Sequence, residues 1–107
     1  MHDVIAHMEL TAIPRNGEQF RMTVNIGRPY LEGESPPTWA CPVSLEPPFG
    51  KLSDIRGVDS FHALCLANRL VLALLNSFKA QGGRLVLDDG SDFPLEAYSP
   101  FAESRGT

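Results

Sequence analysis

Cysteine is scarce in this sequence, and its scarcity excludes one class of small protein. Cys41 and Cys65 are the two cysteines among 107 residues, and both lie in apolar segments. A small secreted domain stabilised by disulfides needs a denser, even set of cysteines, so we expect two reduced thiols. A single domain over residues 1–107, with a polar tail from about residue 99, buries about 65% of its unfolded surface without a disulfide or a metal.

Clustered basic charge is also lacking. Lysine and arginine together number 9 against 13 acidic residues, so the formal net charge is −4, and the cations are scattered from Arg15 to Arg105. Binding to nucleic acid requires clustered lysine and arginine to neutralise phosphates. The composition therefore argues against a nucleic-acid partner and fits a protein partner with a basic surface better.

The sequence has neither a long hydrophobic run nor a recognisable secretory signal. The longest uninterrupted apolar stretch runs from Leu70 to Leu75, which is far short of the ~20 residues that span a bilayer. The first residues, Met1 to Asp3, lack the cationic start of a signal peptide. We therefore expect a cytoplasmic protein with no membrane partner.

The first third of the chain predicts a β-hairpin. Residues 4–12 and 20–26 alternate between apolar and polar side chains and are joined through Asn16-Gly17. A three-residue loop with Gly17 in the left-handed conformation gives a register with one apolar face and one wet face. The apolar face pairs Ala12 with Phe20, Leu10 with Met22, Met8 with Val24 and Ala6 with Ile26. The wet face pairs Thr11 with Arg21, Glu9 with Thr23 and His7 with Asn25.

A third strand is predicted over residues 38–46. Its core face carries Trp39, Cys41, Val43 and Leu45, while Pro42 removes a ladder donor and indicates an edge position or a bulge. Residues 47–57 are then expected to form a loop across the end of the sheet, anchored by Phe49, Leu52 and Ile55.

The clearest single element is a helix over about residues 60–81. Asp59 or Ser60 caps its start, and Gly82-Gly83 ends it. Its apolar side chains cover an arc of roughly 200°, which exceeds the ~100° stripe that one sheet needs. The excess is covered by the long loop, Trp39 or the tail, or else it is shared with a partner or a second copy.

A second hairpin is predicted from Arg84–Leu87 and Phe93–Tyr98. It pairs Leu87 with Phe93 and Leu85 with Leu95 and sets Arg84 opposite Glu96. The expected fold is therefore α+β, an antiparallel sheet of about five strands in the order β-β-β-α-β-β with one long helix packed across one face.

Two groups of side chains suggest ligand binding, and both have a simpler explanation. His62 and Cys65 are three apart on the helix, and Cys41 or His7 would have to complete a metal site, so an incidental surface pair is the favoured explanation. Asp88, Asp89 and Asp92 suggest a divalent cation or a basic partner, but Asp and Gly are also what a tight turn uses. We expect no metal site, no cofactor and no catalytic residue.

Gly-Val-Asp-Ser-Phe-His-Ala-Leu at positions 57–64 opens a Leu-rich helix between two hairpins. This order resembles small stand-alone bacterial domains of unassigned function, and the resemblance implies a fold but no particular catalytic residue. By size and charge alone the chain is also similar to immunity proteins.

The function expected from these patterns is protein association without catalysis. We expect a homodimer or a partner-binding module whose contact surface includes Trp39, Phe49, Leu66 and Leu70. The alternative is a small-molecule or metal-ion binding domain, possibly catalytic, that uses the wet face of the sheet or a polar helix stripe. The wet face carries His7, Glu9, Arg21 and Asn25, and the stripe carries His62, Arg69 and Asn76.

Overall fold

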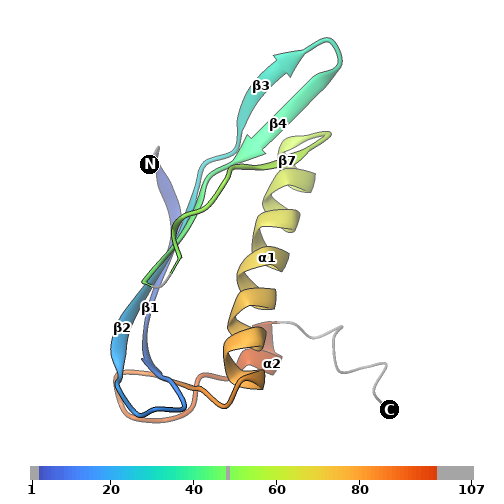
Figure 1. The fold of residues 1–107 in the computed structure, drawn as a ribbon. Helices are drawn as coiled ribbons and strands as arrows, with labels where there is room; N and C mark the ends of the chain where they lie inside the picture. Colours follow the sequence, from blue (N-terminus) through green and yellow to red (C-terminus); the bar gives the residue numbers. More distant parts are fainter. Residues whose placement is uncertain (1–2, 48, 99–107) are drawn as a thin grey trace.

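The protein is an antiparallel sheet with one long helix across a single face, so the expected α+β class is confirmed (Figure 1). This computed structural model describes residues 3–47 and 49–98, and the predicted polar tail lies outside them. The main sheet has five strands in the order β6-β5-β2-β1-β8. Their bounds are Val4–Ile13 for β1, Phe20–Gly27 for β2, Val43–Glu46 for β5, Gly50–Lys51 for β6 and Arg84–Val86 for β8.

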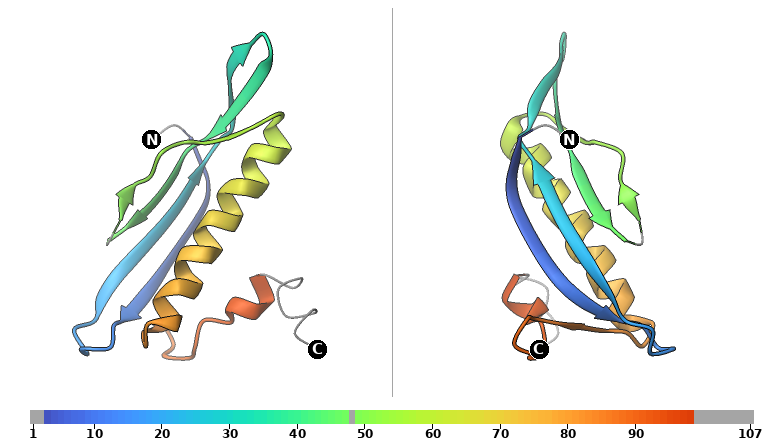
Figure 2. Two further views of the ribbon diagram at one scale, coloured as in Figure 1. Left: turned by 45° about the vertical axis from the view of Figure 1, so that its right-hand side comes forward. Right: turned by 90° about the vertical axis from the view of Figure 1, so that its left-hand side faces the viewer.

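A second, three-stranded sheet continues from one end of the first. Its order is β3-β4-β7, with bounds Tyr30–Glu34, Pro37–Cys41 and Ile55–Gly57. The β3–β4 hairpin projects past the start of helix α1, Ser60–Ala80 (Figures 1 and 2). The sequence patterns predict no strand at β3, and the expected loop over residues 47–57 in fact contains β6 and β7. Strands of two or three residues carry no readable periodicity and form because neighbouring strands pair with them.

The register of the first hairpin is confirmed. All seven predicted pairs between β1 and β2 are present, from Ala6 opposite Ile26 to Ala12 opposite Phe20. Gly17 has a φ of +87°, the left-handed conformation that the turn requires, and its N–H donates to the carbonyl oxygen of Pro14 at 2.8 Å. The alternating pattern determined which face of this sheet meets the core.

The predicted third strand is wrong in one respect, because it breaks at Pro42. β4 and β5 belong to different sheets, and β5 pairs with β2 while β4 pairs with β3 and β7. Proline has no N–H to donate to a ladder, and the Pro42 carbonyl accepts instead from the N–H of Gly27 at 2.8 Å. The predicted core face is otherwise correct, since Cys41, Val43 and Leu45 are fully buried and Trp39 packs half-buried against the core.

Helix α1 has nearly the predicted bounds. The Asp59 carboxylate oxygen Oδ1 accepts from the backbone N–H of His62 at 2.7 Å, which is the N-cap bond. At the other end the N–H of Gly82 donates to Lys79 and that of Gly83 donates to Phe78, with Gly82 at a φ of +96°. The helix buries Ala63, Ala67, Val71 and Leu75 against the sheet. By length and composition alone α1 could also cross a bilayer, a test that core helices of soluble proteins pass as well.

The predicted second hairpin is wrong. Val86 bridges Asp92, and after Pro94 the chain forms a short helix α2, Leu95–Tyr98, in place of a strand. Proline favours the first turn of a helix and cannot donate to a sheet. Phe93 and Leu95 still enter the core, β8 joins the main sheet through β1, and Arg84 pairs with Asp92 rather than lying opposite Glu96.

Candidate functional site

Strand β1 has an open edge over most of its length. On one side β2 pairs with it from Val4 to Ala12, but on the other side β8 pairs only with Thr11–Ile13. Within residues 3–47 and 49–98 no strand therefore pairs with the outer edge from Val4 to Leu10. An unpaired edge of this kind offers a row of backbone N–H and C=O groups to another strand.

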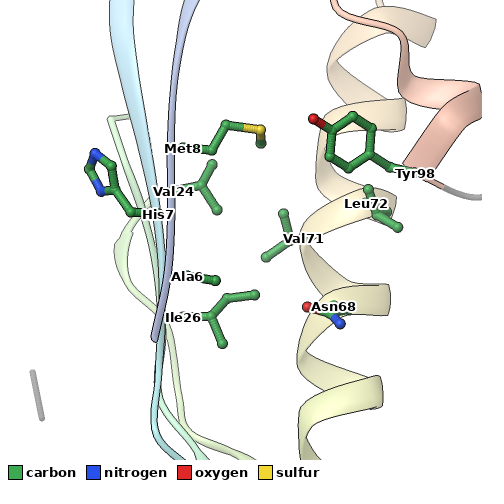
Figure 3. A pocket seen from close by; sticks show the side chains of 9 residues that line it. All are labelled: Ala6, His7, Met8, Val24, Ile26, Asn68, Val71, Leu72 and Tyr98. Atoms are coloured by element: carbon green, nitrogen blue, oxygen red, sulfur yellow. The ribbon is translucent and has the colours of Figure 1, made fainter. Parts of the chain in front are cut away.

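An apolar groove of about 340 Å³ lies beside this edge, between the sheet and α1. Figure 3 shows the side chains of Met8, Val24 and Val71 extending into the space between the two layers. The His7 ring lies on the opposite side of β1 and does not enter this space. The residues that line the groove are Ala6, His7, Met8, Val24 and Ile26 from the sheet, Asn68, Val71 and Leu72 from α1, and Tyr98 from α2.

Among the described residues the groove stays open because the sheet is short here. β8 covers only the far end of β1, and α2 ends at Tyr98, whose ring packs against Phe93 with centroids 4.7 Å apart. Val4 and Ile5, at the start of the open edge, are each 49% exposed. An apolar strand edge next to an apolar groove is typical of a surface that binds another chain.

The wet face of the sheet carries a hydrogen-bonded network. His7 Nδ1 donates to Asn25 Oδ1 at 2.6 Å, and His7 Nε2 lies 3.1 Å from the Glu9 carboxylate. Arg21 pairs with Glu9 at 3.1 Å and with Asp88 at 2.8 Å. The bonds from Asn25 and Glu9 raise the pKa of His7, and those from His7 and Arg21 lower the pKa of Glu9. These groups bond to one another and lie exposed on the sheet.

A family model described as a domain of unknown function, DUF6968, matches residues 6–96 of the chain. The chain belongs to the DUF6968 family. The match includes the open edge of β1 from Ala6 onward, both sheets and all of α1. No curated protein and no solved structure matches the chain significantly. The expected resemblance to a domain family of unassigned function is thus confirmed, and the family assignment specifies no chemistry.

The DUF6968 domain does not bring its candidate metal ligands together. His62 Nδ1 accepts from the Val58 N–H at 3.0 Å, and the Cys65 side chain is half-buried on α1. Cys41 is buried with its thiol near the Gly27 carbonyl, and burial raises the pKa of this thiol. Across residues 3–47 and 49–98, no three His, Cys, Asp or Glu side chains are grouped to hold a metal.

The three aspartates of the predicted acidic turn each have a separate contact. Asp88 pairs with Arg21, and Asp92 pairs with Arg84 at 2.9 Å. Asp89 accepts from the N–H and hydroxyl of Ser91 at 2.9 and 2.6 Å, and these bonds lower its pKa. The register predicted for the second hairpin would also set Asp88 opposite Asp92, but Val86 is the partner of Asp92. These contacts are those of a hydrogen-bonded turn.

The four predicted interface residues lie on different parts of the DUF6968 domain. Trp39 is on β4 against the core, and Phe49 lies between β5 and β6 with 49% of its surface exposed. Leu66 and Leu70 are half-buried on α1. At 100° per residue they lie about 120–160° around the helix from Asn68 and Leu72, which border the groove. No local sequence pattern indicates the groove, because it depends on how far β8 pairs along β1, and β8 pairs only with Thr11–Ile13.

Proposed function

We propose that this DUF6968 domain is a non-catalytic protein-association module that binds an extended segment by strand addition. The observation that carries the proposal is the outer edge of β1 from Val4 to Leu10, with which no strand in the described part of the chain pairs, directly beside an apolar groove. In strand addition, backbone hydrogen bonds to the edge supply affinity, and alternate side chains enter neighbouring pockets and supply specificity.

The chemistry of the groove indicates which segments fit. Ala6 and Met8 point from the edge strand toward α1, so a strand added beside them would direct every second side chain over the same apolar space. The remaining side chains would lie beside the wet face, near His7 and Glu9. The preferred segment is therefore extended, with apolar residues at alternate positions and polar residues between them.

The test compares two double variants. Val4→Lys with Ile5→Lys places charge on the open edge, which natural proteins use to block strand addition. Val58→Lys with Phe61→Lys is the matched control, because these side chains are 70% and 73% exposed and lie at the start of α1. Peptides selected from a displayed random library, and self-association measured by light scattering over a concentration series, provide the two readouts.

We expect the native chain and the control variant to select peptides with alternating apolar residues, or to self-associate. In the edge variant we expect the affinity to fall by more than about tenfold. Circular dichroism and thermal midpoints establish that both variants are folded. A native chain that stays monomeric and selects no such peptides would overturn the proposal, as would binding that the edge variant retains in full.

A second function has one observation in its favour. The groove of about 340 Å³ is within the size range of small-molecule sites and is apolar, with the Asn68 amide and the Tyr98 hydroxyl as polar groups on its border. An apolar ligand of that size would raise the thermal midpoint of the native chain. The same ligand should leave the thermal midpoint of a Leu72→Glu variant unchanged. An equal rise of the thermal midpoint in both proteins would contradict binding in the groove.

A further inference from the structure

We propose that the groove between the sheet and α1 binds an uncharged small molecule that has an apolar body and one hydrogen-bonding group. The proposal rests on the second function given above and names its class of ligand. The groove has a volume of about 340 Å³. At about 30 Å³ for each non-hydrogen atom, the volume that one water molecule occupies in the liquid, it holds roughly 11 such atoms. A short alkyl chain or a single ring with one polar substituent is of this size.

The least exposed side chains that line the groove belong to the hydrophobic core. Val24, Ile26 and Val71 are 4%, 6% and 4% exposed. Figure 3 shows Val24 and Ile26 extending from the sheet, and Val71 extending from α1, into the same space. A ligand in this space would remove its own apolar surface from water against these side chains, which is the main source of affinity in an apolar site.

The groove offers no ionic partner to a ligand among the described residues. Of the residues that line it, His7 is the one whose side chain takes up a positive charge, and its ring lies on the opposite face of β1 (Figure 3). There the ring is bonded to Asn25 and Glu9. A charged group that enters an apolar site loses its hydration, and here it would gain no opposite charge in return. The groove therefore favours an uncharged ligand.

Two uncharged polar side chains favour a ligand with a hydrogen-bonding group. The Asn68 amide from α1 and the Tyr98 hydroxyl from α2 lie at the groove, and neither has a hydrogen bond to another described residue. The Tyr98 ring packs against Phe93 with centroids 4.7 Å apart, which holds it at this position. Because an amide and a hydroxyl can each donate and accept, they suit a hydroxyl, carbonyl or amide group of the ligand.

Three probes of equal chain length test the charge of the ligand: octanol, octanoate and octylammonium. Octanol is uncharged, and the other two carry a negative or a positive charge at the same end of the chain. Binding is measured by NMR from the methyl signals of Met8, Val24 and Val71, which line the groove, over a concentration series of each probe. Octanol is expected to shift these signals and to bind at least about fivefold more tightly than either charged probe.

Ala6→Phe and His7→Phe test where the probe binds. Ala6 lines the groove, whereas the His7 side chain lies on the opposite face, so the same ring enters the groove in one variant and faces water in the other. The affinity for octanol should fall by at least about tenfold in Ala6→Phe and stay unchanged in His7→Phe. Both residues are exposed in the native chain, and circular dichroism establishes that both variants are folded.

Tyr98→Phe and Asn68→Leu test the hydrogen-bonding group. Each variant removes one polar group from the groove, so each should lower the affinity for octanol by about fivefold, the effect of one typical hydrogen bond. Ethylbenzene is a probe of similar size that has no polar group. It should bind equally to the native chain and to both variants, whereas a general disturbance of the groove would weaken both probes.

The possible failures are distinguishable. If neither octanol nor ethylbenzene shifts the groove signals, small-molecule binding here is overturned together with the class of ligand, and peptide selection tests strand addition independently. If a charged probe binds as tightly as octanol, the class of ligand is wrong although the groove is a binding site. Octanol affinity that Ala6→Phe retains in full, or that both Tyr98→Phe and Asn68→Leu leave unchanged, also overturns the proposal.

Discussion

A Cβ atom at Gly57 would stand 2.6 Å from the backbone nitrogen of Ala63. No ordinary contact is that short, so β7 and the first turn of α1 meet here because residue 57 has no side chain. The contact sets the start of the helix against the second sheet and so fixes where α1 crosses the main sheet.

Gly57→Ala should therefore destabilise the domain, because the backbone of α1 has to move away from β7. We expect the free energy of unfolding to fall by about 1–3 kcal/mol, the usual cost of overpacking. Urea denaturation measures this change. Gly33→Ala is the control, since its nearest neighbour would be 3.9 Å away, and equal stability of the two variants would contradict the role of Gly57.

The Tyr30 hydroxyl joins β3 to the segment before β7. It donates to the Asp54 carboxylate at 2.5 Å, and this bond, with those from Lys51, lowers the pKa of Asp54. Tyr30→Phe should lower the free energy of unfolding by about 1 kcal/mol at neutral pH.

A carboxyl group whose pKa is lower in the folded state than in the unfolded state stabilises the fold at pH values above its unfolded pKa. This contribution is lost as the pH falls through the folded pKa. The difference in free energy of unfolding between the native protein and Tyr30→Phe should therefore become smaller at acidic pH. Urea denaturation at neutral and acidic pH measures this difference. Tyr98→Phe, outside this network, is the control. If this difference in free energy of unfolding did not change with pH, Asp54 would not be the group involved.

Asn25 is the main reason for the raised pKa of His7. A raised histidine pKa stabilises the fold below the unfolded value of about 6.5, and this contribution is lost as pH rises through the folded value. Asn25→Ala should lower the pKa of His7 and reduce the loss of stability with rising pH. NMR titration of the imidazole measures the first effect, with Asn76→Ala on α1 as the control. An unchanged His7 titration would contradict the bond to Asn25.

Leu70 and Leu72 distinguish the two flanks of α1 as contact surfaces. Both side chains are half-buried, but Leu72 borders the groove and Leu70 lies about 160° around the helix from it. Leu72→Glu should weaken association, and Leu70→Glu should leave it unchanged while lowering stability by about 1–2 kcal/mol. Light scattering and circular dichroism measure both effects. The opposite result would place the interface on the surface that carries Leu66 and Leu70.

Local patterns were sufficient for two elements of the fold. The β1–β2 register follows from alternation on both sides of Gly17, because a slip of one residue would turn every apolar side chain to water. Helix α1 follows from its cap at Asp59 and its glycine stop, since both signals act within a few residues of each end. The sequence also shows the excess apolar surface of α1.

Contacts between distant segments decided the rest. The break at Pro42 sends β4 and β5 into separate sheets because each meets different partners, and β6 and β7 exist only as paired strands. Pro94 turns the expected last strand into α2. The turn that begins at Leu87 ends β8 at Val86, so within residues 3–47 and 49–98 no strand pairs with the outer edge of β1 from Val4 to Leu10. The sequence by itself therefore determined the apolar faces of β1 and α1, which depend on local periodicity. Only the tertiary structure decided that these faces border an open groove, because that depends on where the chain fails to pair.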